Sequence, residues 1–110
     1  MDDVSRDVLF DVPLAWALET SHIEARRIRM GPSVAAGPHA HNGPVVGNVT
    51  AGSAIFQVED GPEVLLRPGD AFFEPSGVRI SRFDAQEDGV EFFAYFLLGD
   101  DQQSEMTRYE

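Results

Sequence analysis

The chain has 110 residues, enough for one domain with one hydrophobic core and too few for a second. Its formal charge of −11 argues against nucleic acid and anionic membranes as partners. The sequence contains no cysteine and no lysine, which excludes disulfides, thiolate metal sites and Schiff-base chemistry. No apolar run reaches the ~20 residues that cross a bilayer, so a cytoplasmic protein is expected.

Residues 1–22 are expected to form an N-terminal arm. Its apolar residues, which run from Val8 to Leu18, follow a loose pattern, and Pro13 argues against a continuous helix. The pattern predicts a short helix or turn followed by an edge strand. The next segment, Ile23 to Met30, alternates as a half-exposed strand does.

Short segments of strand character then alternate with glycine and proline turns. The pattern predicts strands over residues 45–50, 53–59, 64–67, 71–74, 79–84 and 90–98. Many short strands without a long helical period are typical of an all-β sandwich or barrel. The polar C-terminal tail, residues 99–110, is expected to fray.

The run His39-Ala40-His41 is the most informative part of the chain. In a strand, residues i and i+2 point to one face, so both imidazoles are expected to project into one space. Converging imidazoles are a common beginning of a metal site, which usually needs a third protein ligand, often a carboxylate. Candidates to complete the site are Asp84, Glu74, Gln57 and His22, and spacing favours none of them.

The surrounding sequence resembles the two motifs of the cupin superfamily. The first motif, G-x5-H-x-H-x(3,4)-E-x6-G, has His39 and His41 in place, Val45 at the glutamate position and Gly52 at the closing glycine. The second motif, G-x5-P-x-G-x2-H-x3-N, matches GDAFFEPSGVRISRFD. There, Ile80 stands at the third histidine position and Asp84 at the asparagine position, with Gly69, Pro75 and Gly77 in register.

The resemblance implies a single cupin domain over residues 1–110, an all-β jelly-roll barrel of two antiparallel sheets, paired as a homodimer. Val45 and Ile80 replace two of the four family ligands with aliphatic side chains that cannot bind a metal. The expected cofactor is therefore either none or a weakly bound divalent metal (Fe, Mn, Ni or Zn) on His39 and His41.

Val45 and Ile80 also predict an apolar pocket, which Phe56 and Tyr95 are expected to line. If Ile80 points inward, strict alternation places Arg82 and Asp84 on the same inward face. Arg82 would then need a carboxylate partner, either Asp84 or a ligand. The alternative is that a bulge or the barrel rim leaves Arg82 in water.

The leading hypothesis is a pocket for a small organic molecule with His39, His41 and Arg82 as catalytic residues. A metal-independent isomerase, epimerase or cyclase acting on a small amphipathic acid or carbonyl compound is expected. One alternative is a metal-dependent enzyme of dioxygenase type, with a non-standard ligand set built on His39 and His41. Another is a ligand sensor without turnover.

Overall fold

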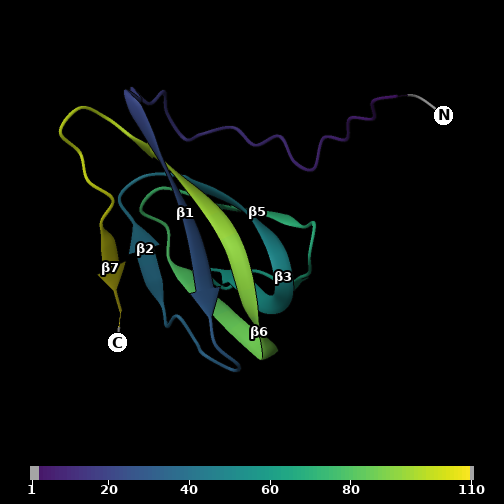
Figure 1. Cartoon of the computed structure of the whole chain (residues 1–110). Coiled ribbons are helices and arrows are strands. Elements are labelled where there is room, and N and C mark those ends of the chain that lie inside the picture. The colour runs from purple at the N-terminus through teal and green to yellow at the C-terminus, as the bar shows by residue number, and fades with distance from the viewer. Residues whose placement is uncertain (1–2, 110) are drawn as a thin grey trace.

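The protein is built from antiparallel strands, as the computed structural model of residues 3–109 shows. The elements are β1 (His22–Met30), β2 (His39–His41), β3 (Val45–Val58), β4 (Val64–Leu66), β5 (Ala71–Glu74), β6 (Ile80–Leu98) and β7 (Met106–Arg108) (Figure 1). No helix occurs among the described residues, which confirms the all-β class. Residues 1 and 2 of the expected arm and residue 110 of the expected tail lie outside the described residues.

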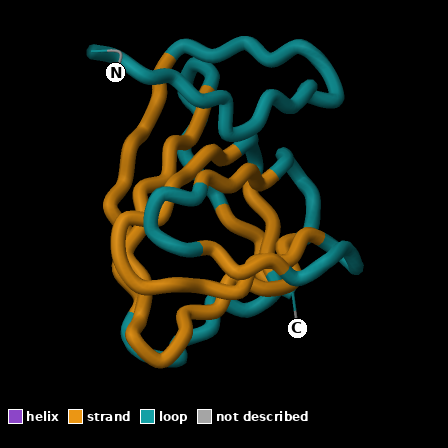
Figure 2. Tube along the Cα trace, turned by 90° about the vertical axis from the view of Figure 1, so that its right-hand side faces the viewer, coloured by secondary structure: helices purple, strands orange, loops and turns teal. Residues whose placement is uncertain are grey.

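The two long strands, β3 and β6, pass through both sheets of the barrel. One sheet has the order β1-β6-β3-β5, in which β1 pairs with residues 90–98 of β6. The other has the order β4-β3-β6-β2-β7 and uses residues 54–58 of β3. Figure 2 shows the strands curving round a common interior. The predicted jelly roll of two antiparallel sheets is confirmed.

Glycines at positions 52 and 89 allow β3 and β6 to stay paired where they bend from one sheet into the other. Gly52 has a φ of 70° and Gly89 a φ of 73°, which L side chains rarely adopt. A Cβ built on Gly52 would lie 2.0 Å from the carbonyl oxygen of Gly89. The expected pair of short strands over 45–50 and 53–59 is therefore one bulged strand.

Aromatic rings fill the space between the sheets. The Phe83 and Phe92 ring centroids are 4.6 Å apart, and Phe72 lies 5.2 Å from Phe83. Each fully buried side chain of this kind stabilises the fold by about 1.5–3 kcal/mol. Two of these residues, Phe83 and Phe92, also line the cavity that the two histidines of β2 line.

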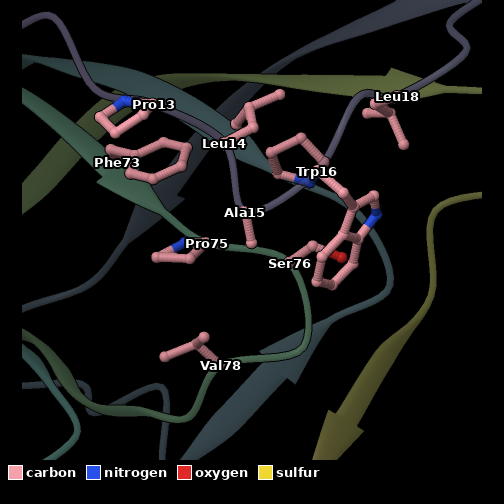
Figure 3. A pocket seen from close by; sticks show the side chains of 10 residues that line it. Pro13, Leu14, Ala15, Trp16, Leu18, Phe73, Pro75, Ser76 and Val78 are labelled. Carbon is pink, nitrogen blue, oxygen red and sulfur yellow. The ribbon is translucent and has the colours of Figure 1, made fainter.

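The N-terminal arm is extended and lies outside the barrel (Figure 1). Its residues 3–20 form neither helix nor strand, so the expected helix and edge strand are wrong; no strand within the described chain pairs with this segment. Val8 is 83% exposed and Trp16 is 65% exposed. An apolar cavity of about 460 Å³ separates the arm from β5, with Leu14 and Trp16 on one side and Phe73 on the other (Figure 3).

The C-terminal segment is held against the histidine strand. Strand β7 pairs with β2 in the register His39–Arg108, Ala40–Thr107 and His41–Met106. The side chain of Asn42 adds a hydrogen bond to the carbonyl of Gln103 and accepts one from the backbone N–H of Glu105. The prediction that this tail frays is therefore wrong.

Within residues 3–109, the structure offers no helix with the length and apolar character needed for a membrane crossing.

Candidate metal centre

Strand β2 directs both histidine side chains into the barrel, as the alternation predicted. The two imidazole centroids are 5.1 Å apart, and their planes are nearly perpendicular at 82°. The side chain of His39 is 5% exposed and that of His41 is 12% exposed. The side chain of Ala40, between them, points away from this space because neighbouring residues of a strand alternate.

Glu74 brings a carboxylate to the two histidines. It is the last residue of β5, and its register partner on β3 is Val45. Its Oε1 lies 3.2 Å from His39 Nε2 and 3.6 Å from His41 Nε2. The candidate ligand atoms of the three residues all lie within 4.8 Å of one another. The histidine pair therefore has a carboxylate beside it, although the motif position that usually supplies the glutamate is occupied by Val45.

The hydrogen bonds of His39 fix the orientation of its ring. Nδ1 lies 2.8 Å from the carbonyl oxygen of Gly37, and a carbonyl only accepts, so Nδ1 carries a hydrogen. Nε2 then faces the Glu74 carboxylate, which is also an acceptor when ionised. Either a proton or a metal ion therefore lies between the two atoms. Donation of the second ring N–H to a backbone carbonyl is typical of a metal-bound histidine.

Without a metal, His39 and Glu74 favour their charged forms. Burial lowers the pKa of His39, but the hydrogen bonds to Glu74 and to the Gly37 carbonyl outweigh burial, so the pKa lies above its ordinary value. Burial raises the pKa of Glu74, but hydrogen bonds from His39 and His41 outweigh it and leave the pKa below its ordinary value. The pair therefore holds a proton in the place where a metal would bind.

The donor set fits a divalent first-row metal. Two imidazole nitrogens and one carboxylate form the two-histidine, one-carboxylate set found in metal sites that keep open positions for substrate. His41 Nδ1 is buried and has no hydrogen-bond partner within the described part of the chain. Such an atom is costly to bury, and a ligand or a bound water would satisfy it.

The three residues lie at one side of a cavity of about 340 Å³. Most of its wall is aliphatic or aromatic, contributed by β1, the loop before β2, and β6: Ile28, Met30, Val34, Ala35, Ala36, Phe83, Phe92, Ala94 and Phe96. Val45 also lines the cavity, as predicted from its motif position. Met106 and Arg108 of β7 complete the lining. A small molecule with an apolar body suits this volume and wall.

Arg82 does not face this cavity, so the predicted inward orientation is wrong. Its guanidinium donates to Asp84 at 2.7 Å and to Glu63, and its side chain is 41% exposed. The cause is a β-bulge on β6: Val58 pairs with Ile80 and Gln57 pairs with Arg82, which leaves Ser81 as an extra residue between them. The bulge reverses the alternation after Ile80, so that Phe83 points inward in place of Arg82.

The other predicted residues lie in three environments. Ile80 and Phe56 belong to the buried core and not to the cavity lining. Tyr95 is 36% exposed and lies outside the lining, because Ala94 and Phe96 on either side of it point inward. The remaining candidates bond elsewhere: Asp84 to Arg82, Gln57 to the Gly61 carbonyl, and His22 to Ser21.

Sequence reasoning missed Arg108. It pairs with His39 across β7 and β2, lines the cavity, and donates from Nη1 to the Ala36 carbonyl at 2.8 Å. Its positive charge lowers the pKa of His39, although less than the other groups raise it. The only sequence signal was an arginine in a polar tail, which gives no indication of a long-range strand pairing.

Comparison with known proteins agrees with this architecture. The Cupin domain family matches residues 26–89. A search of curated proteins gave no match.

Solved structures with the same fold include several enzymes. A DMSP lyase from Ruegeria pomeroyi is 22% identical with a TM-score of 0.67, over 76% of this chain and 42% of the lyase. Oxalate decarboxylase from Bacillus subtilis is 22% identical with a TM-score of 0.68, over 81% of this chain and 24% of the decarboxylase. The chain thus spans less than half of either enzyme.

A structure of similar size is an RmlC-like cupin from Shewanella frigidimarina. It is 25% identical with a TM-score of 0.61, over 72% of this chain and 68% of that protein. The family match covers more than half of the chain, from β1 to the bend in β6. With its histidine strand, its two motifs and its jelly-roll topology, the chain belongs to the cupin family.

Proposed function

We propose that this protein is a metal-dependent cupin enzyme that acts on a small organic molecule, with a divalent ion held by His39, His41 and Glu74. The observation that carries this proposal is the position of Glu74, whose carboxylate lies within 3.6 Å of Nε2 of both histidines. It supplies the anion that two imidazoles alone lack.

The similar enzymes support the proposal in general terms. Mn(II) centres are named for the Bacillus subtilis oxalate decarboxylase, which is 26% identical with a TM-score of 0.62 in that structure. Identity this low carries the fold and leaves substrate and reaction open. Within the chain itself, the convergence of three ligand atoms and the Gly37 contact of His39 are the features that favour a metal.

A divalent ion in this position would act as a Lewis acid toward an oxygen atom of the substrate. The residues of the chain would orient the ligands, exclude water and supply negative charge. Gly37 fixes the ring of His39 through its carbonyl, and Phe92 and Phe96 exclude water from one wall of the cavity. Glu74 would hold negative charge beside the two imidazoles.

Metal-free acid–base catalysis is the second candidate. The 3.2 Å contact between His39 Nε2 and Glu74 Oε1 is also a hydrogen bond through which a proton can be held and transferred. An isomerase, epimerase or cyclase would use this pair directly. A ligand sensor would use the same cavity without turnover.

Metal titration separates these functions. The protein is purified without a nickel column, stripped with a chelator, and titrated with Zn²⁺, Mn²⁺ and Fe²⁺. We expect one ion per chain, weakened by roughly 10- to 100-fold or more in Glu74→Gln, since even outer partners of metal ligands contribute on that scale. Glu63→Gln is the matched control, because Glu63 pairs with Arg82 outside the cavity.

The metal proposal fails if the unchanged protein binds less than one ion per chain at saturating concentrations. It also fails if Glu63→Gln weakens binding as much as Glu74→Gln. Turnover by the chelated protein would then favour the metal-free enzyme.

We also infer that the protein forms a homodimer. Strand β1 pairs with β6 along one edge, and its other edge has no partner strand within residues 3–109. The arm immediately before it exposes apolar side chains, among them Val8, Leu9 and Trp16. A second copy is the occupant that this surface suits, because two free β1 edges can pair by a two-fold axis.

A further inference from the structure

We propose that Arg108 recognises the carboxylate of a small, otherwise apolar monoanionic ligand at the rim of the histidine cavity. This inference rests on the proposed function, because it names the class of molecule that the same cavity would take. It assigns the role of fixed cation to a residue on the C-terminal strand.

The strand register places Arg108 at the cavity. His39 and Arg108 are register partners on β2 and β7, and directly opposed residues of antiparallel strands project to the same face. His41 and Met106 are partners in the same way. Because both histidines face the cavity, the side chains of Met106 and Arg108 do so as well, and both belong to its lining.

The charges in the cavity favour an anion. Arg108 is the one arginine among the described lining residues, and Glu74 is the one carboxylate. The Glu74 carboxylate contacts both His39 and His41. The Arg108 guanidinium uses only one of its N–H donors within the described chain, in the hydrogen bond to the Ala36 carbonyl. A guanidinium has five N–H donors, so several remain for a ligand. No acid is within salt-bridge distance of Arg108 in the described chain, although the whole chain is strongly acidic.

The rest of the wall decides which anion fits. A carboxylate matches the planar fork of one guanidinium, which can donate to both oxygens. A phosphate dianion would leave further oxygen atoms against aliphatic and aromatic side chains such as Ile28 and Phe92, where unpaired charge is costly. The walls therefore favour a compact apolar body with a single carboxylate.

A matched pair of probes tests the inference by binding. The acid 3-phenylpropionate and its neutral amide have the same apolar body, and isothermal titration measures both against chelated and Zn²⁺-loaded full-length protein. In chelated protein, we expect the acid to bind roughly 10- to 100-fold more tightly than the amide, the scale of a charged hydrogen bond. The preference should fall with added salt, because Arg108 is exposed at the rim.

Three variants identify the residue responsible. Arg108→Gln should abolish the preference for the acid and leave the affinity for the amide unchanged. Arg108→Lys retains the charge but loses the planar guanidinium, so it should keep part of the preference for the acid. It replaces Arg108→Gln as the test if that variant destabilises β7. Arg82→Gln is the control, because it removes the same charge from the outer face.

Each result bears on one proposal at a time. A preference for the acid that survives in Arg108→Gln, or that disappears equally in Arg82→Gln, overturns the role of Arg108. Equal binding of acid and amide by the unchanged protein overturns the ligand class. Zn²⁺ affinity is measured on the same variants. If the unchanged protein does not bind Zn²⁺ but the chelated protein still prefers the acid, the metal site is overturned and the role of Arg108 stands.

Discussion

Val45 and Glu74 are direct partners across β3 and β5, and both side chains are buried in the barrel. The cupin motif places a glutamate at the position of Val45. Side chains of directly opposed residues have Cβ atoms about 4.5–5.5 Å apart and share one face of the sheet. A carboxylate on either strand therefore reaches the same region of the barrel.

An exchange of the two residues tests this equivalence. Glu74→Val should weaken Zn²⁺ binding by roughly 10- to 100-fold or more, because the site loses its anion. The double variant Val45→Glu/Glu74→Val should recover most of the affinity, since it returns the carboxylate to the motif position. Competition with a chelating dye measures both. A double variant as weak as Glu74→Val would show that position 74 offers a geometry that position 45 cannot.

The His39–Glu74 pair predicts the pH dependence of stability in chelated protein. The raised pKa of His39 gives stabilisation that is complete below its ordinary value of 6.5 and is lost as pH rises through the raised pKa. The lowered pKa of Glu74 gives stabilisation that is complete above its ordinary value of 4.5 and is lost as pH falls through the lowered pKa. The pair should therefore contribute fully between pH 4.5 and 6.5.

Urea unfolding of the unchanged protein and Glu74→Gln measures this contribution across pH. The difference in free energy of unfolding should be largest in that window and should shrink on both sides. Glu87→Gln is a control at an exposed position of β6. A difference that is independent of pH would contradict the charged pair.

Gly47 is predicted to be intolerant of any side chain. A Cβ there would lie 2.2 Å from Cζ of Phe72 and 2.6 Å from the carbonyl oxygen of Phe93. Gly47→Ala should lower the free energy of unfolding by about 1–3 kcal/mol or more, as overpacking does in dense cores. Gly31→Ala, whose nearest contact would be 3.7 Å from Val34, should be close to neutral. Equal stability of the two variants in urea would count against this packing.

The exposed arm leads to an expectation about assembly. Light scattering at micromolar concentration should give the mass of a dimer, and Trp16→Asp should raise the dimer dissociation constant by about 10- to 100-fold, the scale of a lost aromatic anchor. Val64→Asp, at an exposed position on β4, should leave it unchanged. A monomer mass for the unchanged protein would rule out the proposed dimer.

The sequence carried enough information for the jelly roll and for the histidine pair. Turn residues such as Pro68-Gly69 separate the strands, and the spacing of His39 and His41 sets their common face within one short strand. Both are local signals. Glu74 was one of four candidates for the third ligand, and it could not be singled out because its selection depends on the register of β5 against β3.

The errors also arose from long-range pairing. Counting from Ile80 places Arg82 inward, but Ser81 is an extra residue on β6 where it pairs with β3, and this bulge reverses the count within two residues. Arg108 was assigned to a fraying tail because nothing near it in the sequence indicates that β7 pairs with β2. In both cases a partner strand distant in sequence decides where an arginine points.

The pairing of β2 with β7 links the histidine strand to the last described residues of the chain. Strand β2 pairs with β6 only at His39–Ile80 and pairs with β7 at three positions. Most of the strand pairing of β2 is therefore with β7. An ion bound to His39 and His41 would hold β2 in place, and β2 would in turn hold β7. Metal loading should therefore slow digestion of the C-terminus by carboxypeptidase, which makes proteolysis a reporter of site occupancy that needs no knowledge of the substrate.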